Sequence, residues 1–138
     1  MNVAQWMTKA VVTIKPQDTL RHARELMTKH RINQLPVVVN DKLIGIVTDR
    51  DIRDAYPSSL RPPHGKDIDE FADSYTAEDF MTYNVLAVSP QTPLREAARH
   101  LRRQRFGALP VVETGKLVGI ITRSDLLDAM LAEEARED

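Results

Sequence analysis

The sequence contains no cysteine, which excludes a disulfide framework, thiolate catalysis and zinc–thiolate sites and is compatible with a reducing cytosol. An excess of charge of one sign is also lacking: 19 basic against 20 acidic residues leave a formal net charge of −1, so no overall field recruits nucleic acid or an anionic bilayer. No apolar stretch approaches membrane-spanning length, and residues 1–10 lack the basic and apolar regions of a signal peptide. We therefore expect a cytoplasmic protein with no membrane partner.

The two halves of the chain repeat one another. Sliding the sequence against itself by 74 positions aligns residues 7–52 with residues 81–126 without a gap, and 19 of the 46 aligned pairs are identical. Such a repeat predicts two copies of one structural unit. We expect copy 1 at residues 1–56, a linker at 57–76, and copy 2 at 77–138 with a C-terminal helix and a charged tail.

Each copy begins with a β-type run and a helix. The runs at residues 11–14 and 85–88 are ended by prolines, and apolar residues at helical spacing follow: Leu20, Ala23 and Met27 in copy 1, and Leu94, Ala97, Ala98 and Leu101 in copy 2. Asp18 and Thr92 are expected as the helix N-caps.

Two paired strands and a second helix complete each copy. Asn33 and Gly107 are expected to take left-handed conformations just past the first helices. The strands are expected at residues 35–39 and 43–47, and at 109–113 and 117–121, with turns at 40–41 and 114–115.

The last strand of each copy runs into the motif Thr-x-x-Asp, which begins at Thr48 and at Thr122. A threonine before a helix and an acid three positions later form a capping box. The free N–H groups of the same helix start could also hold a phosphate, while Asp51 or Asp125 accepts hydrogen bonds from sugar hydroxyls. For one copy, capping alone is the better interpretation; two copies after matched strands favour a nucleoside-phosphate site, and both roles can coexist.

The segments outside the repeat carry weaker signals. The linker has turn chemistry and one short helix is expected around residues 68–71. After the second motif, an apolar helix face is expected, and the charged tail at 133–138 should fray; the face is formed by Leu126, Leu127, Met130 and Leu131.

The predicted fold class is α/β (α+β), with two β-α-β-β-α repeats. Each repeat is too small to bury its own sheet well, so we expect the two to pack face to face about a pseudo-twofold axis. The clefts between them would hold both Thr-x-x-Asp motifs.

Three elements carry a resemblance to a known family, and they cover nearly everything outside the linker. They are Met7-Thr8 and Met81-Thr82, the Leu35-Pro36-Val37-Val38 and Leu109-Pro110-Val111-Val112 strands, and the Thr-x-x-Asp endings after Gly45 and Gly119. This pattern resembles the cystathionine-β-synthase (CBS) domain in the tandem pair called a Bateman module, and is most similar to bacterial stand-alone pairs of the acetoin-utilisation regulatory type. The resemblance implies a non-enzymatic regulatory module that binds AMP, ADP, ATP or S-adenosylmethionine, requires no cofactor, forms a homodimer and acts on a further protein.

The resemblance also implies the site residues. Asp51 and Asp125 would bind ribose and Thr48 and Thr122 phosphate, with Arg50 and Arg123 completing the set. Adenine would lie against Ala10, Val11, Val12, Asn33, Gln34, Leu35 and Pro36 in one cleft, and against Asn84, Val85, Leu86, Gly107, Ala108, Leu109 and Pro110 in the other. Because Asp49 has no acidic counterpart in copy 2, phosphate is expected to bind more tightly near Asp125.

Other function classes have less support. Four scattered histidines lack metal-ligand spacing, so no metal site is expected. No serine has a base beside it and no paired carboxylates suggest hydrolysis, so an enzyme is the class least expected. A cluster of arginines at 99–105 lacks interleaved aromatics and is better interpreted as a solvated helix end than as a nucleic-acid contact. The alternative to a nucleotide sensor is a ligand-free dimerisation or interaction scaffold.

Overall fold

The computed structural model describes residues 1–55, 68–104 and 107–137. Its contacts divide the chain into two compact units: the first unit is Val12–Val85, and the second unit is Met1–Val11 together with Leu86–Asp138. The mixture of helices and strands confirms the α/β class. The units differ from the two sequence copies, so the boundaries 1–56, 57–76 and 77–138 stay a prediction for domains.

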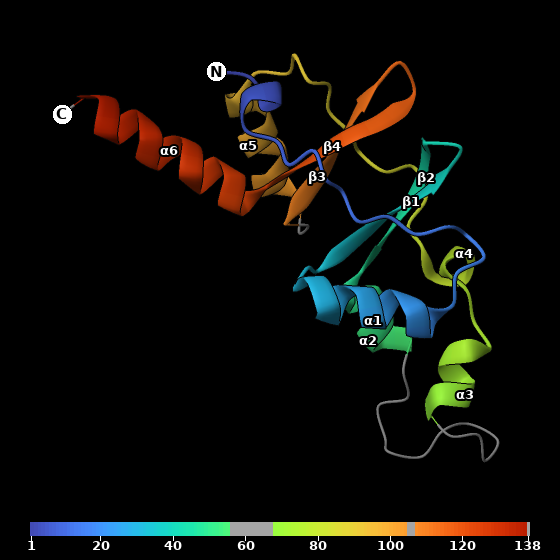
Figure 1. Cartoon of the computed structure of the whole chain (residues 1–138). Helices are drawn as coiled ribbons and strands as arrows, with labels where there is room; N and C mark the ends of the chain where they lie inside the picture. Colours follow the sequence, from blue (N-terminus) through green and yellow to red (C-terminus); the bar gives the residue numbers. More distant parts are fainter. Residues whose placement is uncertain (56–67, 105–106, 138) are drawn as a thin grey trace. The chain divides into compact units, whose positions relative to one another are not determined.

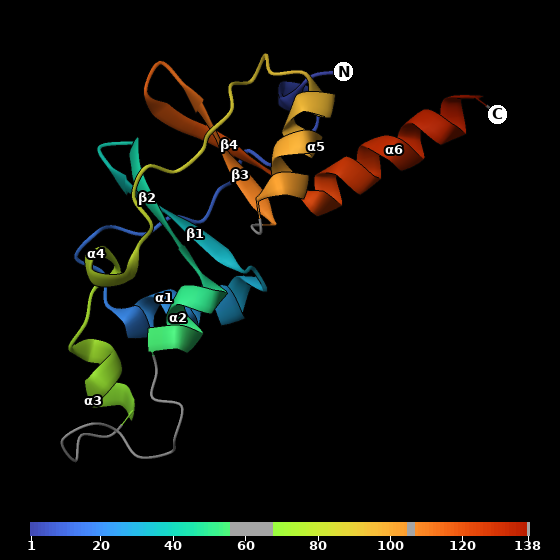
Figure 2. The ribbon, with the colours of Figure 1, turned by 180° about the vertical axis from the view of Figure 1, so that it is seen from behind.

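The first unit is built on one β-hairpin. Strands β1 (Gln34–Val39) and β2 (Lys42–Thr48) pair antiparallel, with Leu35 opposite Val47. Helix α1 packs against α2 and β1 (Figures 1 and 2). The described helices of this unit are α1 (Leu20–His30), α2 (Asp49–Ala55), α3 (Ile68–Asp73) and α4 (Ala77–Phe80). The short linker helix is thereby confirmed as α3.

The second unit repeats this plan. Strands β3 (Ala108–Glu113) and β4 (Lys116–Thr122) pair antiparallel, with Leu109 opposite Ile121. The N-terminal 3-10 helix η1 (Val3–Gln5) lies beside the start of α5 (Figure 1), because Val3 N–H donates to the Thr92 carbonyl at 2.9 Å. The described residues of the unit form the α-helices α5 (Leu94–Arg103) and α6 (Arg123–Glu137).

The hairpin turns lie where the sequence predicts them. Asn40 and Asp41 have φ of 51° and 67°, and Thr114 and Gly115 have φ of 53° and 79°. Two consecutive positive φ values match the right-handed twist of the strands that they join, as in type I′ turns. The four predicted strands are confirmed, each one or two residues longer than expected.

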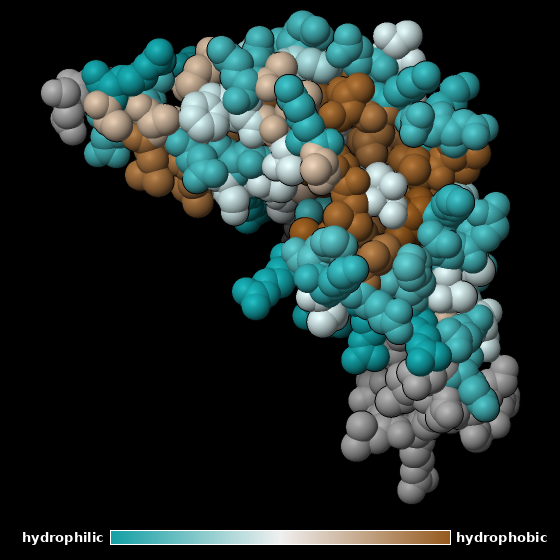
Figure 3. Space-filling model, viewed as in Figure 1, coloured by the Kyte–Doolittle hydropathy of each residue, from teal (hydrophilic) through white to brown (hydrophobic). Residues whose placement is uncertain are grey.

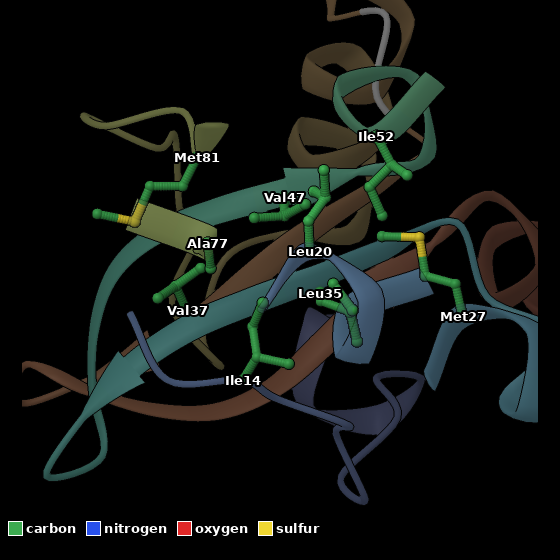
Figure 4. Close-up of a cluster of buried hydrophobic side chains, with 10 residues drawn as sticks. Ile14, Leu20, Met27, Leu35, Val37, Val47, Ile52, Ala77 and Met81 are labelled. Carbon is green, nitrogen blue, oxygen red and sulfur yellow. The ribbon is translucent and has the colours of Figure 1, made fainter. Parts of the chain in front are cut away.

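Each unit has a core of its own. In the first unit Leu20, Leu35, Val37 and Val47 are fully buried and point toward one another (Figure 4). The predicted stripe on α1 is confirmed, since Leu20, Ala23 and Met27 are all buried. On α5 the buried residues are Leu94, Ala97 and Leu101, while Ala98 is half-buried.

The first residues of each copy bond to the last strand of the other copy. Thr8 exchanges two backbone hydrogen bonds with Ile120 of β4, of 2.8 and 2.9 Å. Thr82 does the same with Ile46 of β2, at 2.9 and 3.1 Å. Ile46 can do so because it forms a non-hydrogen-bonded pair with Pro36 of β1, so its N–H and carbonyl both point away from β1. These Met-Thr segments are therefore exchanged between the copies.

Two glycines allow this close approach. A Cβ at Gly45 would lie 2.7 Å from the Met81 sulfur and 3.0 Å from the Thr82 carbonyl oxygen. A Cβ at Gly119 would likewise lie 2.7 Å from the Met7 sulfur and 3.0 Å from the Thr8 carbonyl oxygen. A methyl group at either position would displace the exchanged segment.

The predicted helix N-caps were wrong by one position. Thr19, rather than Asp18, caps α1, because its side chain accepts from His22 N–H at 3.1 Å. Asp18 instead accepts from Lys15 N–H at 2.8 Å, and Thr92 from Ser89 N–H at 2.9 Å. Both polar side chains accept from the amide three positions earlier and so close the turn that precedes the helix.

Three further expectations need correction. Arg31, with φ 54°, is the left-handed residue after α1, and Asn33 is not. Gly107 does not have a positive φ either. The runs at 11–14 and 85–88 each make a single parallel bridge, Ile14 with Val37 and Val88 with Val111, so neither is a strand. The charged tail is helical through Glu137, since α6 continues into it.

Candidate functional site

Both Thr-x-x-Asp motifs form reciprocal capping boxes. In the first unit Thr48 N–H donates to Asp51 Oδ2 at 2.8 Å, and Asp51 N–H donates to the Thr48 hydroxyl at 3.2 Å. In the second unit the corresponding distances between Thr122 and Asp125 are 2.9 and 3.2 Å. The capping role predicted from the sequence is confirmed, and it fixes the orientation of both carboxylates.

The helix starts have fewer free amides than the sequence suggests. Asp49 N–H donates to the Asn33 carbonyl at 2.8 Å, and Arg123 N–H donates to the Gly107 carbonyl at 3.1 Å. With the two capping-box bonds added, most of the first amides of α2 and α6 already have partners. A phosphate could therefore rely on these backbone groups less than expected, and side-chain donors become more important.

The two aspartates differ at their second oxygen. Asp125 Oδ1 accepts from the Thr8 hydroxyl at 3.4 Å. Among the hydrogen bonds of the described residues, none reaches Asp51 Oδ1. Asp51 is half-buried, so this oxygen is a fixed acceptor that a pair of sugar hydroxyls could bind.

The charged residues around the motifs are engaged differently. In the first unit two ion pairs lie along α2. Asp49 pairs with Arg53 at 3.5 Å, and Arg50 pairs with Asp54 at 3.9 Å. In the second unit the Arg123 guanidinium donates to the Leu101 carbonyl at 3.4 Å. No ion pair to Arg123 occurs among the described residues, so its charge is not neutralised as that of Arg50 is.

The exchange of segments decides which predicted site residues lie in one unit. Ala10 and Val11 belong to the second unit, with Gly107, Ala108, Leu109, Pro110, Thr122, Arg123 and Asp125. Asn84 and Val85 belong to the first unit, with Val12, Asn33, Gln34, Leu35, Pro36, Thr48, Arg50 and Asp51. The sequence analysis grouped Ala10 and Val11 with Asn33 and Pro36; in the structure they are grouped with the other copy. Their contact with a ligand stays a prediction.

Several predicted adenine contacts have side chains in the cores. Leu35 is 0% and Leu109 1% exposed, and Ala108 is also buried. Only their backbone groups can face a ligand. Asn33 and Gly107, which precede these residues, are exposed.

Thr8 and Thr82 are missing from the predicted site. Thr8 reaches Asp125 through its hydroxyl, and Thr82 holds the equivalent place beside β2. The signal that could have found them is the Met-Thr pair, which is identical in the two copies. The exchange that brings them to the motifs of the other copy is not visible in local sequence patterns.

The family model of the CBS domain matches residues 3–58 and 77–132. The chain belongs to the CBS domain family. It carries two CBS domains in tandem, as the internal repeat predicts. A CBS domain-containing protein of Dictyostelium discoideum is 38% identical over 131 residues, which cover 94% of this chain and 90% of the relative.

Solved structures of CBS pairs have the same fold. The acetoin utilization protein AcuB from Vibrio cholerae has a TM-score of 0.82 at 33% identity, with 100% of this chain and 97% of that chain covered. CBSX2 of Arabidopsis thaliana in complex with AMP has a TM-score of 0.81 at 31% identity, covering 96% and 98%. The CBS domain pair of protein MJ0100 in complex with 5′-methylthioadenosine and S-adenosyl-L-methionine has a TM-score of 0.77 at 26% identity, covering 96% and 98%.

Some relatives are enzymes, but the chain matches only a small part of them. An inosine-5′-monophosphate dehydrogenase of Korarchaeum cryptofilum is 35% identical over 122 residues, which make up 22% of that enzyme. In the described part of the CBS pair, no group of three or more His, Cys, Asp or Glu side chains could hold a metal ion. None of the described helices is both long and apolar enough to cross a membrane.

Proposed function

We propose that this CBS pair is a regulatory module that binds an adenosine ligand through its Thr-x-x-Asp motifs. The observation that carries the proposal is the Asp51 carboxylate, whose Oδ2 is fixed by Thr48 N–H at 2.8 Å while its Oδ1 remains available. A ribose presents two adjacent hydroxyl donors, which a fixed carboxylate can accept together. The AMP complex of CBSX2 and the S-adenosyl-L-methionine complex of the MJ0100 pair support this class of ligand.

Phosphate binding is expected to be tighter near Asp125. Arg123 has no acidic partner among the described side chains, whereas Arg50 forms an ion pair with Asp54, with 3.9 Å between Nε and Oδ2. Asp49, which would repel a phosphate near Thr48, has arginine as its counterpart in copy 2. Ligand binding would then shift the pair between arrangements that a regulated protein can distinguish.

Titration calorimetry with AMP tests the proposal. The wild type should bind AMP, and Asp51→Ala and Asp125→Ala should each remove the binding at their own site. Asp41→Ala is a matched control, because Asp41 lies in the β1–β2 turn and should leave binding unchanged. If Asp51→Ala abolished AMP binding and Asp125→Ala left it intact, the expected preference for the Asp125 site would be wrong.

The same titration separates the sensor from a ligand-free scaffold. In a scaffold, alanine at Asp51 or Asp125 would change stability only through the lost cap, by about 0.5–2 kcal/mol. Wild-type protein that released no heat with AMP, ADP, ATP or S-adenosylmethionine would favour the scaffold. Any turnover of these ligands by the purified chain would contradict a non-enzymatic role.

A further inference from the structure

Four arginines gather at the C-terminal half of α5 in the second unit: Arg99, Arg102, Arg103 and Arg123. We call them the α5 arginine cluster, and all four side chains are exposed. The three that belong to α5 are spaced by three and four residues from Arg99, which puts them on one side of the helix. Arg123 joins them from α6, because its guanidinium donates to the Leu101 carbonyl in the last turn of α5 at 3.4 Å.

The cluster has no acidic partner inside the described chain. Among residues 1–55, 68–104 and 107–137, no ion pair reaches any of the four arginines. The C-terminal end of a helix attracts cations, but its dipole is equivalent to only about half an elementary charge. Like charges three and four positions apart on a helix also repel each other. The helix end alone therefore does not explain four positive charges at this place.

Copy 1 lacks this concentration of positive charge. In the repeat alignment the places of Arg99, Arg102, Arg103 and Arg123 are taken by Glu25, Thr28, Lys29 and Asp49. Four positive charges in copy 2 thus correspond to one positive and two negative charges in copy 1. Glu25 and Asp49 are each paired with an arginine at 3.5 Å. A CBS domain therefore folds without the cluster, which is a feature of copy 2 alone.

The apolar surface of the second unit lies elsewhere. Hydrophobic surface is visible along the lower side of α6 in Figure 3. It belongs to a groove between α6 and α5 whose lining includes Ala98, Leu127 and Met130. None of the four arginines lines that groove. The cluster is therefore a separate, charged surface.

We propose that the α5 arginine cluster binds an acidic segment of the protein that this module regulates. The planar guanidinium can pair with a carboxylate through two parallel hydrogen bonds, and every member of the cluster is arginine rather than lysine. Arg99 and Arg103 are about 6 Å apart along the helix axis. Alternate residues of an extended chain are about 6.6 Å apart. A segment with acidic side chains at alternate positions therefore matches both arginines.

Carboxylates suit this surface better than a nucleic acid. Binding of single-stranded nucleic acid relies on aromatic side chains that stack on the bases. Neither α5 nor α6 contains an aromatic residue. The net charge of −1 also provides no long-range attraction for a polynucleotide. A short acidic segment needs only the local charge of the cluster.

Arg123 belongs both to the cluster and to the second Thr-x-x-Asp motif. A ligand phosphate near Asp125 would pair with Arg123 and neutralise one of the four charges. The nucleotide should then weaken binding of the acidic segment, and by linkage the segment should weaken binding of the nucleotide to the same extent. This competition rests on the proposed function, whereas binding of the acidic segment does not.

Fluorescence anisotropy with a labelled peptide in which glutamate alternates with serine tests the proposal. The wild type should bind the peptide, and added salt should weaken the binding. Arg99→Gln combined with Arg103→Gln should weaken it about tenfold or more. Arg50→Gln combined with Arg53→Gln is the matched control, because it removes two charges that are already paired on α2. No binding by the wild type, or an equal loss in both double variants, would contradict the proposal.

A gain of binding excludes loss of folding as the explanation. In the Arg99→Gln and Arg103→Gln background, replacing Glu25, Thr28 and Asp49 by arginine builds the cluster on copy 1 and should restore binding of the peptide. Failure to restore it would contradict recognition by clustered arginines. An oligothymidylate of equal charge should bind the wild type more weakly than the peptide does, and tighter binding of the oligothymidylate would contradict a protein partner.

The same assay with ATP tests the shared role of Arg123. Saturating ATP should raise the dissociation constant of the peptide about fivefold in the wild type and leave it unchanged in Arg123→Gln. If calorimetry shows ATP to be bound while the affinity for the peptide stays the same, competition through Arg123 is wrong. If the peptide binds but ATP and the other adenosine ligands do not, the docking surface stands and the proposed function fails.

Discussion

The Thr8 hydroxyl donates to Asp125 Oδ1 across 3.4 Å, although 117 positions of sequence separate the two residues. This bond joins the N-terminal segment to the second Thr-x-x-Asp motif. The described residues show no equivalent bond between Thr82 and Asp51. Two motifs that look alike in the sequence therefore differ in how much of their carboxylate is available to a ligand.

Thr8→Val should strengthen AMP binding at the Asp125 site. A ribose must displace the Thr8 hydroxyl from Oδ1, and removing a weak hydrogen bond of this kind should lower the dissociation constant about two- to fivefold, or ~0.4–1 kcal/mol. Calorimetry in an Asp51→Ala background isolates this site.

The matched control is Thr82→Val in an Asp125→Ala background, where no change is expected because no bond to Asp51 is lost. Weaker binding after Thr8→Val would instead make the hydroxyl a direct contact of the ligand.

Gly45→Ala and Gly119→Ala should each destabilise the fold by about 1–3 kcal/mol, because the added methyl group overlaps a methionine sulfur and a backbone carbonyl oxygen of the exchanged segment. Urea denaturation measures the loss. Gly107→Ala is the control, since a Cβ at Gly107 meets no atom within 4 Å. Equal stability of Gly45→Ala and Gly107→Ala would show that the Met-Thr segment can move aside at little cost.

Thr114→Asn should stabilise the protein by about 0.5–1 kcal/mol. Thr114 has φ 53°, a left-handed conformation that a β-branched residue tolerates poorly and asparagine tolerates well. Copy 1 already has asparagine at this place, with φ 51° at Asn40. Thermal unfolding should give a higher midpoint for Thr114→Asn and a lower one for Asn40→Thr; changes of the opposite sign would be incompatible with strain at these turns.

The sequence was most informative where structure depends on neighbouring residues. The hairpins follow from the β-type runs and from turn residues such as Asn40 and Gly115, and the capping boxes follow from the spacing of Thr and Asp. The duplication made these predictions stronger, because each copy checked the other. The helix caps were wrong by one residue because Asp18 and Thr92 can serve either of two adjacent turns.

Long-range pairing was not predictable in the same way. The bonds of Thr8 to Ile120 and of Thr82 to Ile46 join segments that are far apart, and no local pattern specifies which copy each segment binds. Gly45 and Gly119 indicate where a segment packs closely, since each precedes a residue that bonds to an exchanged segment. A glycine alone does not predict which segment that is. The grouping of Ala10 with copy 2 followed from this exchange and not from the sequence.

A thermal-shift titration of the wild type, Asp51→Ala and Asp125→Ala with AMP, ADP, ATP, S-adenosylmethionine and GTP tests adenosine binding most directly. A ligand at a hundred times its dissociation constant adds about 2.7 kcal/mol of stability, which raises the midpoint by several degrees for a chain of this size. We predict such a rise with at least one adenosine ligand, none with GTP, and a smaller rise in each variant. No rise with any adenosine ligand, or an undiminished rise in both variants, would contradict binding at the Thr-x-x-Asp motifs.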